Sequence, residues 1–534
     1  MKTEWGNFQE YLYSNNELNL QIDISRVNLP ENYLEEMKSR IQRVFLQIRE
    51  MERGGIANQD EQRMVGHYWL SDPDISPTAE IGNQIKLTLD RIKDFTRKVH
   101  QGVISGQTGR TFRNILVVGI GGSSLGTRFV SDALRETGQP CKLYFIDNTD
   151  PDAMDRIFDE LRGKMDETLT IVISKSGGTV ETRNGMEEVR YFYEKQELDF
   201  SRHTVSITQA GSKLDKICIK EGWLDSFPMW EWVGGRTSVL SAVGLLPLAL
   251  QGIDIDGLLE GARICNSLTR KTEVRSNPAA LLALAWDYLT GGKGGKQMVV
   301  LPYKDRLELF AKYLQQLVME SLGKEKDLDG KTVHQGLTVY GNKGSSDQHS
   351  YLQQLLEGPD NFFLIFIEVL KDREGNSLKI AEESTSGDYL HAFLLGTRNA
   401  ITQKGKSSIT ITVKEINAKS IGCLIALFER IVSIYALLVN INAYHQPAVE
   451  MSKKGAHEVI RIKNLIVSIL SSCKGQGLTI EEIAQAIRQN NGIENSKINQ
   501  EIIYKVLQHL AANRSYGIEK IIDSNEFRSL YKFK

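Results

Sequence analysis

A turn rich in hydroxyl groups and glycine joins an apolar run to a helical pattern in the sequence TLTIVISKSGGTVET. The run from Leu169 to Ile173 is largely β-branched, which predicts a buried strand, and Val180 begins the helical pattern. Between them lie the hydroxyls of Ser174, Ser176 and Thr179. Hydroxyl donors beside the first free N–H groups of a helix favour an anion. An ordinary serine-capped turn has the same pattern, so the turn alone leaves both interpretations open.

A second glycine-rich turn, GIGGSSLG, follows the apolar strand pattern from Ile115 to Ile120. A dinucleotide-binding GxGxxG that began at Gly119 would need its third glycine at position 124, which is Ser124. Asp147 could still supply the acidic residue expected about 20 residues further on, so that interpretation stays open. The spacing favours a loop that contacts a sugar or a phosphate.

Three further segments carry side chains suited to proton transfer or charge stabilisation. Two glycines precede Arg236, which suits a guanidinium held close to backbone in a cleft, although a surface arginine is the simpler interpretation. Gln316 and Glu320 are four residues apart and share one face of a predicted helix, where they could also be merely solvated. His349 follows a glycine-rich loop at a predicted helix start capped by serine, a better position for chemistry than a lone core histidine has.

Composition and charge narrow the class of protein. The chain has 534 residues, which predicts at least two domains, and its formal net charge of −2 argues against nucleic acid or an anionic membrane as partner. Its five cysteines form no CxxC pair, which fits a reducing compartment without a zinc site. No leader pattern begins the chain and no apolar run reaches the length of a membrane span, about 18 residues. We therefore expect a cytoplasmic protein.

The elements that must position these residues alternate between strand and helix patterns. This alternation predicts an α/β fold with parallel sheets whose loops gather at the carboxyl ends of the strands. The predicted strands include residues 142–147, 168–174, 203–208, 297–301, 361–370 and 407–416. Buried helices are expected at 278–289 and 418–440, and a long helix is expected at 305–322.

The chain divides by pattern into four segments. Residues 1–110 are mostly helical and should pack on the body, and 111–276 form a first α/β domain with the hydroxyl-rich turn. Residues 277–455 form a second α/β domain that holds Glu320 and His349. The tail, 456–534, has three amphipathic helical patterns that need a partner surface, and its 11 Lys and Arg against 8 Asp and Glu are too weak a surplus to indicate DNA binding.

Six motifs occur in an order that resembles the glucose-6-phosphate isomerase family over about residues 60–455. They are GIGGSSLG, SKSGGTVET, EWVGGR, QLVMESLGK, DQHS and QPAVEMSK. The sequence departs from the family pattern at Thr237, where an aromatic residue is frequent, and at His445 and Ala448, where Asp or Asn and Gly are frequent. The resemblance implies two sugar-isomerase domains of flavodoxin-like architecture, followed here by a helical tail.

The resemblance also implies a role for each candidate residue. Glu320 would move a proton between C2 and C1 of the open sugar, His349 with Lys453 would open the ring, and Arg236 would stabilise the enediolate. The expected catalytic residues are Glu320, His349, Lys453 and Arg236, and the expected substrate-binding residues are Gly122, Ser123, Ser174, Lys175, Ser176, Thr179, Gln316 and Gln446.

The reaction implied by the resemblance is the interconversion of glucose 6-phosphate and fructose 6-phosphate, in glycolysis and gluconeogenesis. It implies a homodimer with shared active sites, no metal and no cofactor, while the net charge and the apolar pattern are the reasons to expect no nucleic acid and no membrane as partners. Two alternatives of other classes stay open on the sequence. One is a nicotinamide-dependent dehydrogenase that uses the turn after Ile120, and the other is a sugar-phosphate sensor without turnover.

Overall fold

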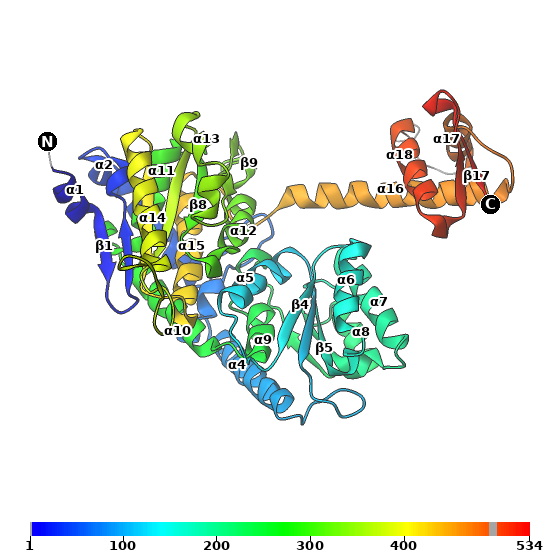
Figure 1. Cartoon of the computed structure of the whole chain (residues 1–534), viewed down its shortest axis with the longest axis horizontal. Coiled ribbons are helices and arrows are strands. Elements are labelled where there is room, and N and C mark those ends of the chain that lie inside the picture. Colours follow the sequence, from blue (N-terminus) through cyan, green and yellow to red (C-terminus); the bar gives the residue numbers. More distant parts are fainter. Residues whose placement is uncertain (1–2, 491–498) are drawn as a thin grey trace. The chain divides into compact units, whose positions relative to one another are not determined.

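The computed structural model describes residues 3–490 and 499–534, and it divides into two compact units (Figure 1). The first unit is Met1–His445 and the second is Gln446–Lys534. The division from sequence into four segments stays a prediction. The first unit contains both parallel sheets, and each unit is described below by itself.

The first sheet has five parallel strands in the order β4-β3-β5-β6-β7. Its strands are β3 (Asn114–Val118), β4 (Lys142–Ile146), β5 (Thr168–Ile173), β6 (Thr204–Thr208) and β7 (Asp225–Pro228). Alternate side chains of β3 point to opposite faces, with Val117 in one buried cluster and Leu116 in another. A parallel sheet covered on both faces needs such continuously apolar strands, so this part of the fold follows from the sequence.

Helices cover the two faces of this sheet. Those that connect consecutive strands are α5 (Leu125–Ala133), α6 (Pro151–Leu161), α7 (Val180–Glu194) and α8 (Lys213–Glu221). α4 (Ala79–His100) packs on α9 (Ala242–Gln251), and α9 contacts β3. The loops that follow β3 and β5 therefore meet at one edge of the sheet, as the register Ile115 opposite Leu169 requires.

The second sheet has six strands in the order β1-β2-β15-β12-β8-β11. Four are parallel: β8 (Gln297–Pro302), β11 (Val339–Tyr340), β12 (Phe362–Val369) and β15 (Ser408–Val413). The antiparallel pair β1 (Leu12–Asn15) and β2 (Leu20–Asp23) extends it from the N-terminus. The sequence pattern missed this hairpin because each strand has only four residues, too few to establish a period of two.

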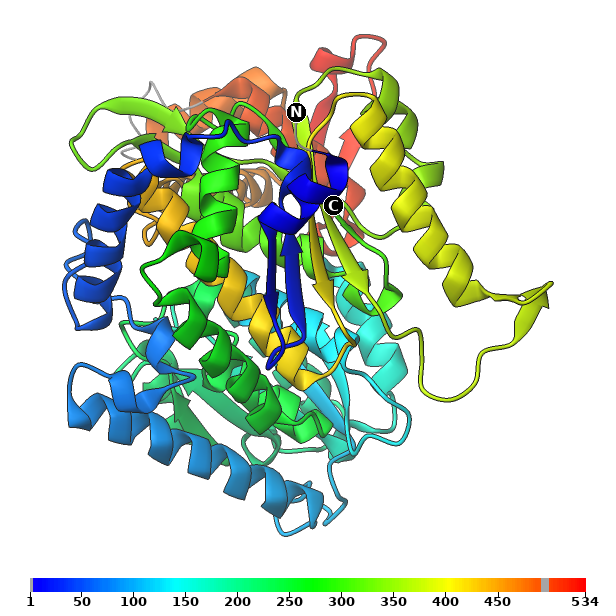
Figure 2. The same ribbon diagram turned by 90° about the vertical axis from the view of Figure 1, so that its left-hand side faces the viewer.

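Among the described residues, one helix, α15 (Ala418–Leu438), is long and apolar enough to span a membrane, so the expectation that no apolar run reaches that length is wrong. Of its most apolar window, 94% is buried within the protein, which identifies it as a core helix. It packs against α10 (Ile255–Thr269) and α11 (Pro278–Thr290), and Figure 2 shows this gold helix beside the green ones. The buried helices predicted at 278–289 and 418–440 are confirmed.

The predicted long helix at 305–322 is broken into pieces. A 3-10 turn at Asp305–Leu307 precedes α12 (Phe310–Leu314), and the chain then winds into a π-helix, η10 (Gln315–Glu320). Apolar periodicity does not separate a π-helix from an α-helix over so few residues, so the sequence could not show this change. π-Turns inside helices occur frequently at functional sites.

The remaining helices and strands of this unit lie around these layers. They are α1 (Glu4–Tyr11), α2 (Tyr33–Glu36), α3 (Lys38–Glu52), β9 (Lys324–Lys326), β10 (Thr332–Gln335), α13 (Leu352–Glu357), β13 (Lys379–Ala381), β14 (Ser384–Thr385) and α14 (Ser386–Gln403). α14 covers the second sheet on the face opposite α15, where Leu364 and Phe366 of β12 are buried.

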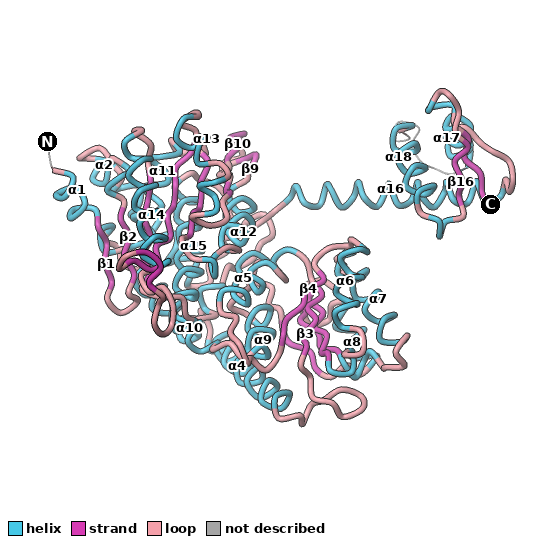
Figure 3. The backbone as a smooth tube through the Cα atoms, in the orientation of Figure 1, coloured by secondary structure: helices cyan, strands magenta, loops and turns pink. Residues whose placement is uncertain are grey.

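The C-terminal unit has a hydrophobic core of its own, and Figure 3 shows that it contains both helices and strands. Its elements are α16 (Pro447–Ser472), α17 (Ile480–Asn490), α18 (Gln500–Ala512), β16 (Ile518–Ile521) and β17 (Leu530–Phe533). The Thr479 side chain caps α17 in a capping box with Glu482. The apolar faces of the three helices pack on one another, so the expectation that they need a surface outside the tail is wrong. The 26-residue α16 begins at Pro447 and runs through residue 455, where the sequence pattern ended the second α/β domain.

Candidate active site

The hydroxyl-rich turn after β5 leaves the start of α7 open to an anion. Ser174 is buried and its Oγ accepts from the Gly177 N–H at 3.1 Å, while Ser176 Oγ accepts from the Gly178 N–H at 3.1 Å. Thr179 is the N-cap of α7, yet its side chain makes no capping hydrogen bond. The first amides of a 15-residue helix therefore keep their attraction for negative charge.

Backbone geometry requires glycine at one position of this turn. Gly177 has φ of +66°, and a Cβ there would overlap the backbone nitrogen of Leu214 at the start of α8. Only glycine combines this conformation with this close approach. The turn is thus fixed by its contact with α8 as well as by its own hydrogen bonds.

Lys175 ties the turn to the segment that precedes Arg236. Its ammonium donates to the carbonyl oxygens of Glu231 at 2.8 Å and Val233 at 3.0 Å. Burial first, and then the charge of Arg63, lower the pKa of Lys175 to about 8. The sequence indicated Lys175 only as a substrate-binding residue, so this structural use of its side chain was missed.

The turn after β3 touches the Gly-Gly-Arg segment directly. A Cβ on Gly122 would overlap the backbone of Gly235, so the two segments approach as closely as glycine allows. Ser238 Oγ donates to the carbonyls of Gly122 at 3.2 Å and Gly235 at 2.7 Å. Ser123 ends the 3-10 turn at Gly121–Ser123 beside this contact.

Arg236 is buried and lies beside Glu320. It is 6% exposed, so the alternative of a surface arginine is wrong. Its Nε donates to Ser321 Oγ at 2.8 Å, its Nη2 donates to the carbonyl oxygens of Ala443 and His445, and its Nη1 lies 3.6 Å from Glu320 Oε2. Gln316 Nε2 lies within 3.2 Å of the position that a Cβ on Gly121 would take. The structure thus brings together Gln316, Glu320, Arg236 and the turn after β3.

A group of polar residues that the sequence did not indicate supports the carbonyls that bind Arg236. Asn442 Nδ2 donates to Asn58 Oδ1 at 3.0 Å and to the carboxylate of Asp60. His445 Nδ1 lies 3.7 Å from Asp60 Oδ2, and burial lowers the pKa of His445. No motif marks Asn58 or Asp60, and the departure at His445 is the only signal the sequence offered.

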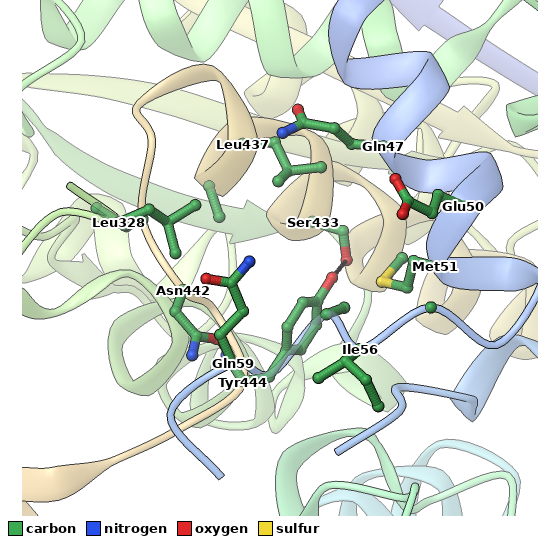
Figure 4. A pocket seen from close by; sticks show the side chains of 14 residues that line it. Gln47, Glu50, Met51, Ile56, Gln59, Leu328, Ser433, Leu437, Asn442 and Tyr444 are labelled. Atoms are coloured by element: carbon green, nitrogen blue, oxygen red, sulfur yellow. Dashed lines mark hydrogen bonds between the residues drawn. The ribbon is translucent and has the colours of Figure 1, made fainter. Parts of the chain in front are cut away.

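A pocket of about 140 Å³ adjoins the same backbone (Figure 4). Tyr444 lines it and donates to Ser433 Oγ at 2.9 Å, and Asn442 points into it from the same segment. Apolar side chains such as Met51, Ile56 and Leu328 form much of its wall. None of the predicted site residues lines this pocket, so it is separate from the candidate active site.

His349 is not joined to Glu320 in this way, and two further predicted site residues belong to the other compact unit. His349 is exposed and ends a short 3-10 turn, Ser346–His349, in place of the predicted capped helix start. Across the described residues, no hydrogen bond or ion pair links His349 to Glu320. Gln446 is the N-cap of α16 and Lys453 lies in the second turn of that helix, both in the C-terminal unit.

The parallel sheets flanked by helices have the architecture of the aldose–ketose isomerases that are built from sugar-isomerase domains. The family model described as phosphoglucose isomerase matches residues 23–475. The chain belongs to this family. The predicted fold class and enzyme class are thereby confirmed.

Individual relatives agree along nearly the whole chain. Over 516 residues the chain is 60% identical to glucose-6-phosphate isomerase of Desulfitobacterium hafniense (strain Y51), which covers 97% of this chain and 96% of the relative. It is 54% identical over 514 residues to glucose-6-phosphate isomerase of Geotalea daltonii, with 96% of each chain covered. A solved glucose-6-phosphate isomerase from Chlamydia trachomatis is 25% identical, has a TM-score of 0.77, and covers 85% of this chain and 90% of its own.

Proposed function

We propose that this site interconverts glucose 6-phosphate and fructose 6-phosphate by opening the sugar ring and moving one proton through a cis-enediolate. The observation that carries the proposal is the Glu320 carboxylate beside the buried Arg236 guanidinium, at 3.6 Å. A carboxylate can remove a proton from carbon, and a fixed cation can stabilise the oxygen charge that then develops. Family membership supports this reaction and disfavours the dehydrogenase alternative.

The phosphate group would bind at the turn between β5 and α7. Ser176 and Thr179 would donate through their hydroxyls, and buried Ser174 would help to shape the turn. The open amides at the start of α7 support this placement, as does the nearby turn of Gly122 and Ser123. The bound phosphate would hold the sugar so that the carbon chain of the sugar lies along the contact between Gly122 and Gly235.

Glu320 would take the proton from C2 of the open aldose and return it to C1. One carboxylate can serve both carbons because they are adjacent on one face of the enediolate. Arg236 would stabilise the enediolate oxygen, and Gln316 and Gln446 would orient hydroxyl groups. The closeness of Gln316 to Gly121 supports its share of this role.

His349 would open the ring together with Lys453, and the site would be completed by a second copy of the chain. His349 is exposed in the single chain and has no hydrogen bond or ion pair to Glu320 across the described residues, which suits a residue that serves a neighbouring site. We therefore propose a homodimer with shared active sites. The proposed reaction needs no metal and no cofactor, and we propose the cytoplasm as its location.

The experiment is a coupled assay of purified full-length protein with fructose 6-phosphate, in which the glucose 6-phosphate formed is oxidised with reduction of a nicotinamide coenzyme. Wild-type protein should turn over, and Glu325→Gln should match it because Glu325 is exposed and only five residues from Glu320. A sugar-phosphate sensor would bind fructose 6-phosphate without forming product. Binding without turnover would therefore overturn the proposed function.

A further inference from the structure

Lys324 buries an ammonium group four residues after Glu320. The residue is 6% exposed, and its Nζ donates to the carbonyl oxygens of Glu320 and Ser321, each at 2.8 Å. Burying a charge is costly unless hydrogen bonds compensate for lost water. One of these hydrogen bonds is thus to the backbone of Glu320, the residue proposed to transfer the proton.

The two carbonyls are available because the helix ends at this point. η10 ends at Glu320, Gly323 still donates to the Met319 carbonyl at 2.9 Å, and Lys324 then begins β9. The last carbonyls of a helix have no partner within it. The Lys324 side chain supplies that partner, and its positive charge also suits the negative end of the helix dipole.

The backbone of Lys324 is itself held in place. β9 pairs with β10, and Lys324 lies opposite Gln335 in that register. Gln335 in turn donates through Nε2 to the Gly292 carbonyl at 2.7 Å. The ammonium therefore acts from a fixed point on the hairpin, so it can hold the turn of Glu320 in one position.

Arg236 holds the same turn from its other side. Its Nε donates to Ser321 Oγ at 2.8 Å, and its Nη1 lies 3.6 Å from the Glu320 carboxylate. Lys324 thus binds the backbone of this turn, while Arg236 binds the Ser321 side chain and lies beside the Glu320 carboxylate.

We propose that Lys324 is a positioning residue for Glu320: it fixes the end of the π-helix so that the carboxylate faces Arg236 and the substrate. This inference rests on the proposed role of Glu320. Lys324 does not itself need to touch the sugar, because both of its bonds are to backbone.

The charge of Lys324 also changes in the neutral range. Burial first, and then the charge of Arg236, lower its pKa to about 7 against the opposing charges of Glu320 and Asp60. His445 belongs to the same group of charges. As pH rises through this value the amine keeps N–H groups to donate but loses its charge, so its hold on the two carbonyls weakens.

The test compares Lys324→Met and Lys324→Arg with Lys326→Met, a matched control because Lys326 is exposed on the same strand. kcat and KM for fructose 6-phosphate are measured between about pH 6 and 9 on the full chain, with melting temperatures. Lys324→Met should lower kcat about 10- to 100-fold with little change in KM, since the phosphate turn is intact. Lys324→Arg should keep more activity and lose the inflection near neutral pH, because arginine stays charged.

A Lys324→Met kcat within about twofold of wild type would overturn the inference, as would an unchanged inflection in Lys324→Arg. If Lys324→Met fails to fold, the pH profile of Lys324→Arg decides alone. Glu320→Gln separates the two proposals. If wild-type protein is active and Glu320→Gln is inactive, a Lys324→Met variant with wild-type kcat refutes only the positioning role of Lys324. If Glu320→Gln is active, the proposed role of Glu320 in the reaction is itself refuted.

Discussion

The carboxylate of Glu320 is attracted to Arg236 without being tied to it. Their 3.6 Å separation exceeds a hydrogen-bond distance, and the guanidinium instead donates to Ser321 Oγ and to two backbone carbonyls. Across the described residues, no hydrogen bond reaches the Glu320 carboxylate. A base that must accept, carry and return a proton benefits from this arrangement, because no strong partner has to be displaced in each step.

Affinity for the phosphate should depend on the hydroxyls of the turn after β5. Thr179→Ala removes a donor that no capping bond uses, whereas Ser174→Ala also removes the acceptor of the Gly177 N–H. Each hydrogen bond lost to a charged group is worth roughly 1.5–3 kcal/mol. The dissociation constant of fructose 6-phosphate, measured by calorimetry, should rise in both variants, and inorganic phosphate should compete in wild type. Unchanged affinity in the double variant would place the anion elsewhere.

At the scale of elements, the sequence was sufficient where a short apolar run meets a glycine-rich turn. The longer parallel strands β3, β4, β5, β6, β8, β12 and β15, the turn after β5 and the capping box of α17 follow from local residue types, whereas the short strands β7 and β11 were not predicted. Other elements depend on contacts that a local pattern does not contain. The hairpin of β1 and β2 is stabilised by the pairing of β2 with β15. The carbonyl of Glu320 at the end of the π-helix accepts a hydrogen bond from the Lys324 side chain of β9.

The candidate site also has a part that the sequence predicted and a part that it did not. Its residue types pointed to Glu320, Arg236 and the hydroxyl-rich turn, but no pattern showed that Arg236 is buried or that Asn442 and Asp60 support its carbonyl partners. The serine-capped helix predicted to begin beside His349 is instead the 3-10 turn Ser346–His349, in which the Asp347 carboxylate accepts from the Asn342 N–H and stabilises the loop.

The turn between β5 and α7 should be sensitive to one glycine and tolerant at its neighbour. Gly177→Ala would place a Cβ against the backbone of Leu214 at a positive φ, whereas a Cβ on Gly178 meets only Ser176 Oγ at 3.4 Å. A strained conformation of this kind costs of the order of 1–3 kcal/mol. We expect Gly177→Ala to lower the melting temperature and weaken phosphate affinity, with Gly178→Ala close to wild type. Equal behaviour of the two variants would show that the turn is not held as described.

At the scale of the whole molecule, the candidate residues lie on both compact units. Glu320, Arg236 and the phosphate turn belong to Met1–His445, while Gln446 and Lys453 begin the long helix of Gln446–Lys534. The family model ends at residue 475, within the C-terminal unit. The relatives from Desulfitobacterium hafniense and Geotalea daltonii match 97% and 96% of the chain, so their match includes most of that unit. The C-terminal unit, with its own core, is therefore a shared part of these proteins.

If the active sites are shared between two subunits, two inactive variants should restore activity in a mixed dimer. His349→Ala and Glu320→Gln should each be inactive, and mixing them with subunit exchange should restore activity. If the histidine of one chain serves the glutamate of the other, a hybrid contains one site with both changes and one with neither. The assay uses heterodimers verified by two different affinity tags. Verified heterodimers without activity would show that each site is built from a single chain.

The most direct measurement of the central claim is proton exchange at the sugar carbons in deuterated water, followed by nuclear magnetic resonance. Wild-type protein and the Glu325→Gln control should introduce deuterium at C2 of glucose 6-phosphate and C1 of fructose 6-phosphate, because a proton held by a carboxylate can exchange with solvent. Glu320→Gln should still bind the substrate, and it should lose exchange and isomerisation together, by about 10²- to 10⁴-fold. Exchange at the wild-type rate in Glu320→Gln would contradict the account, since another group would then carry the proton.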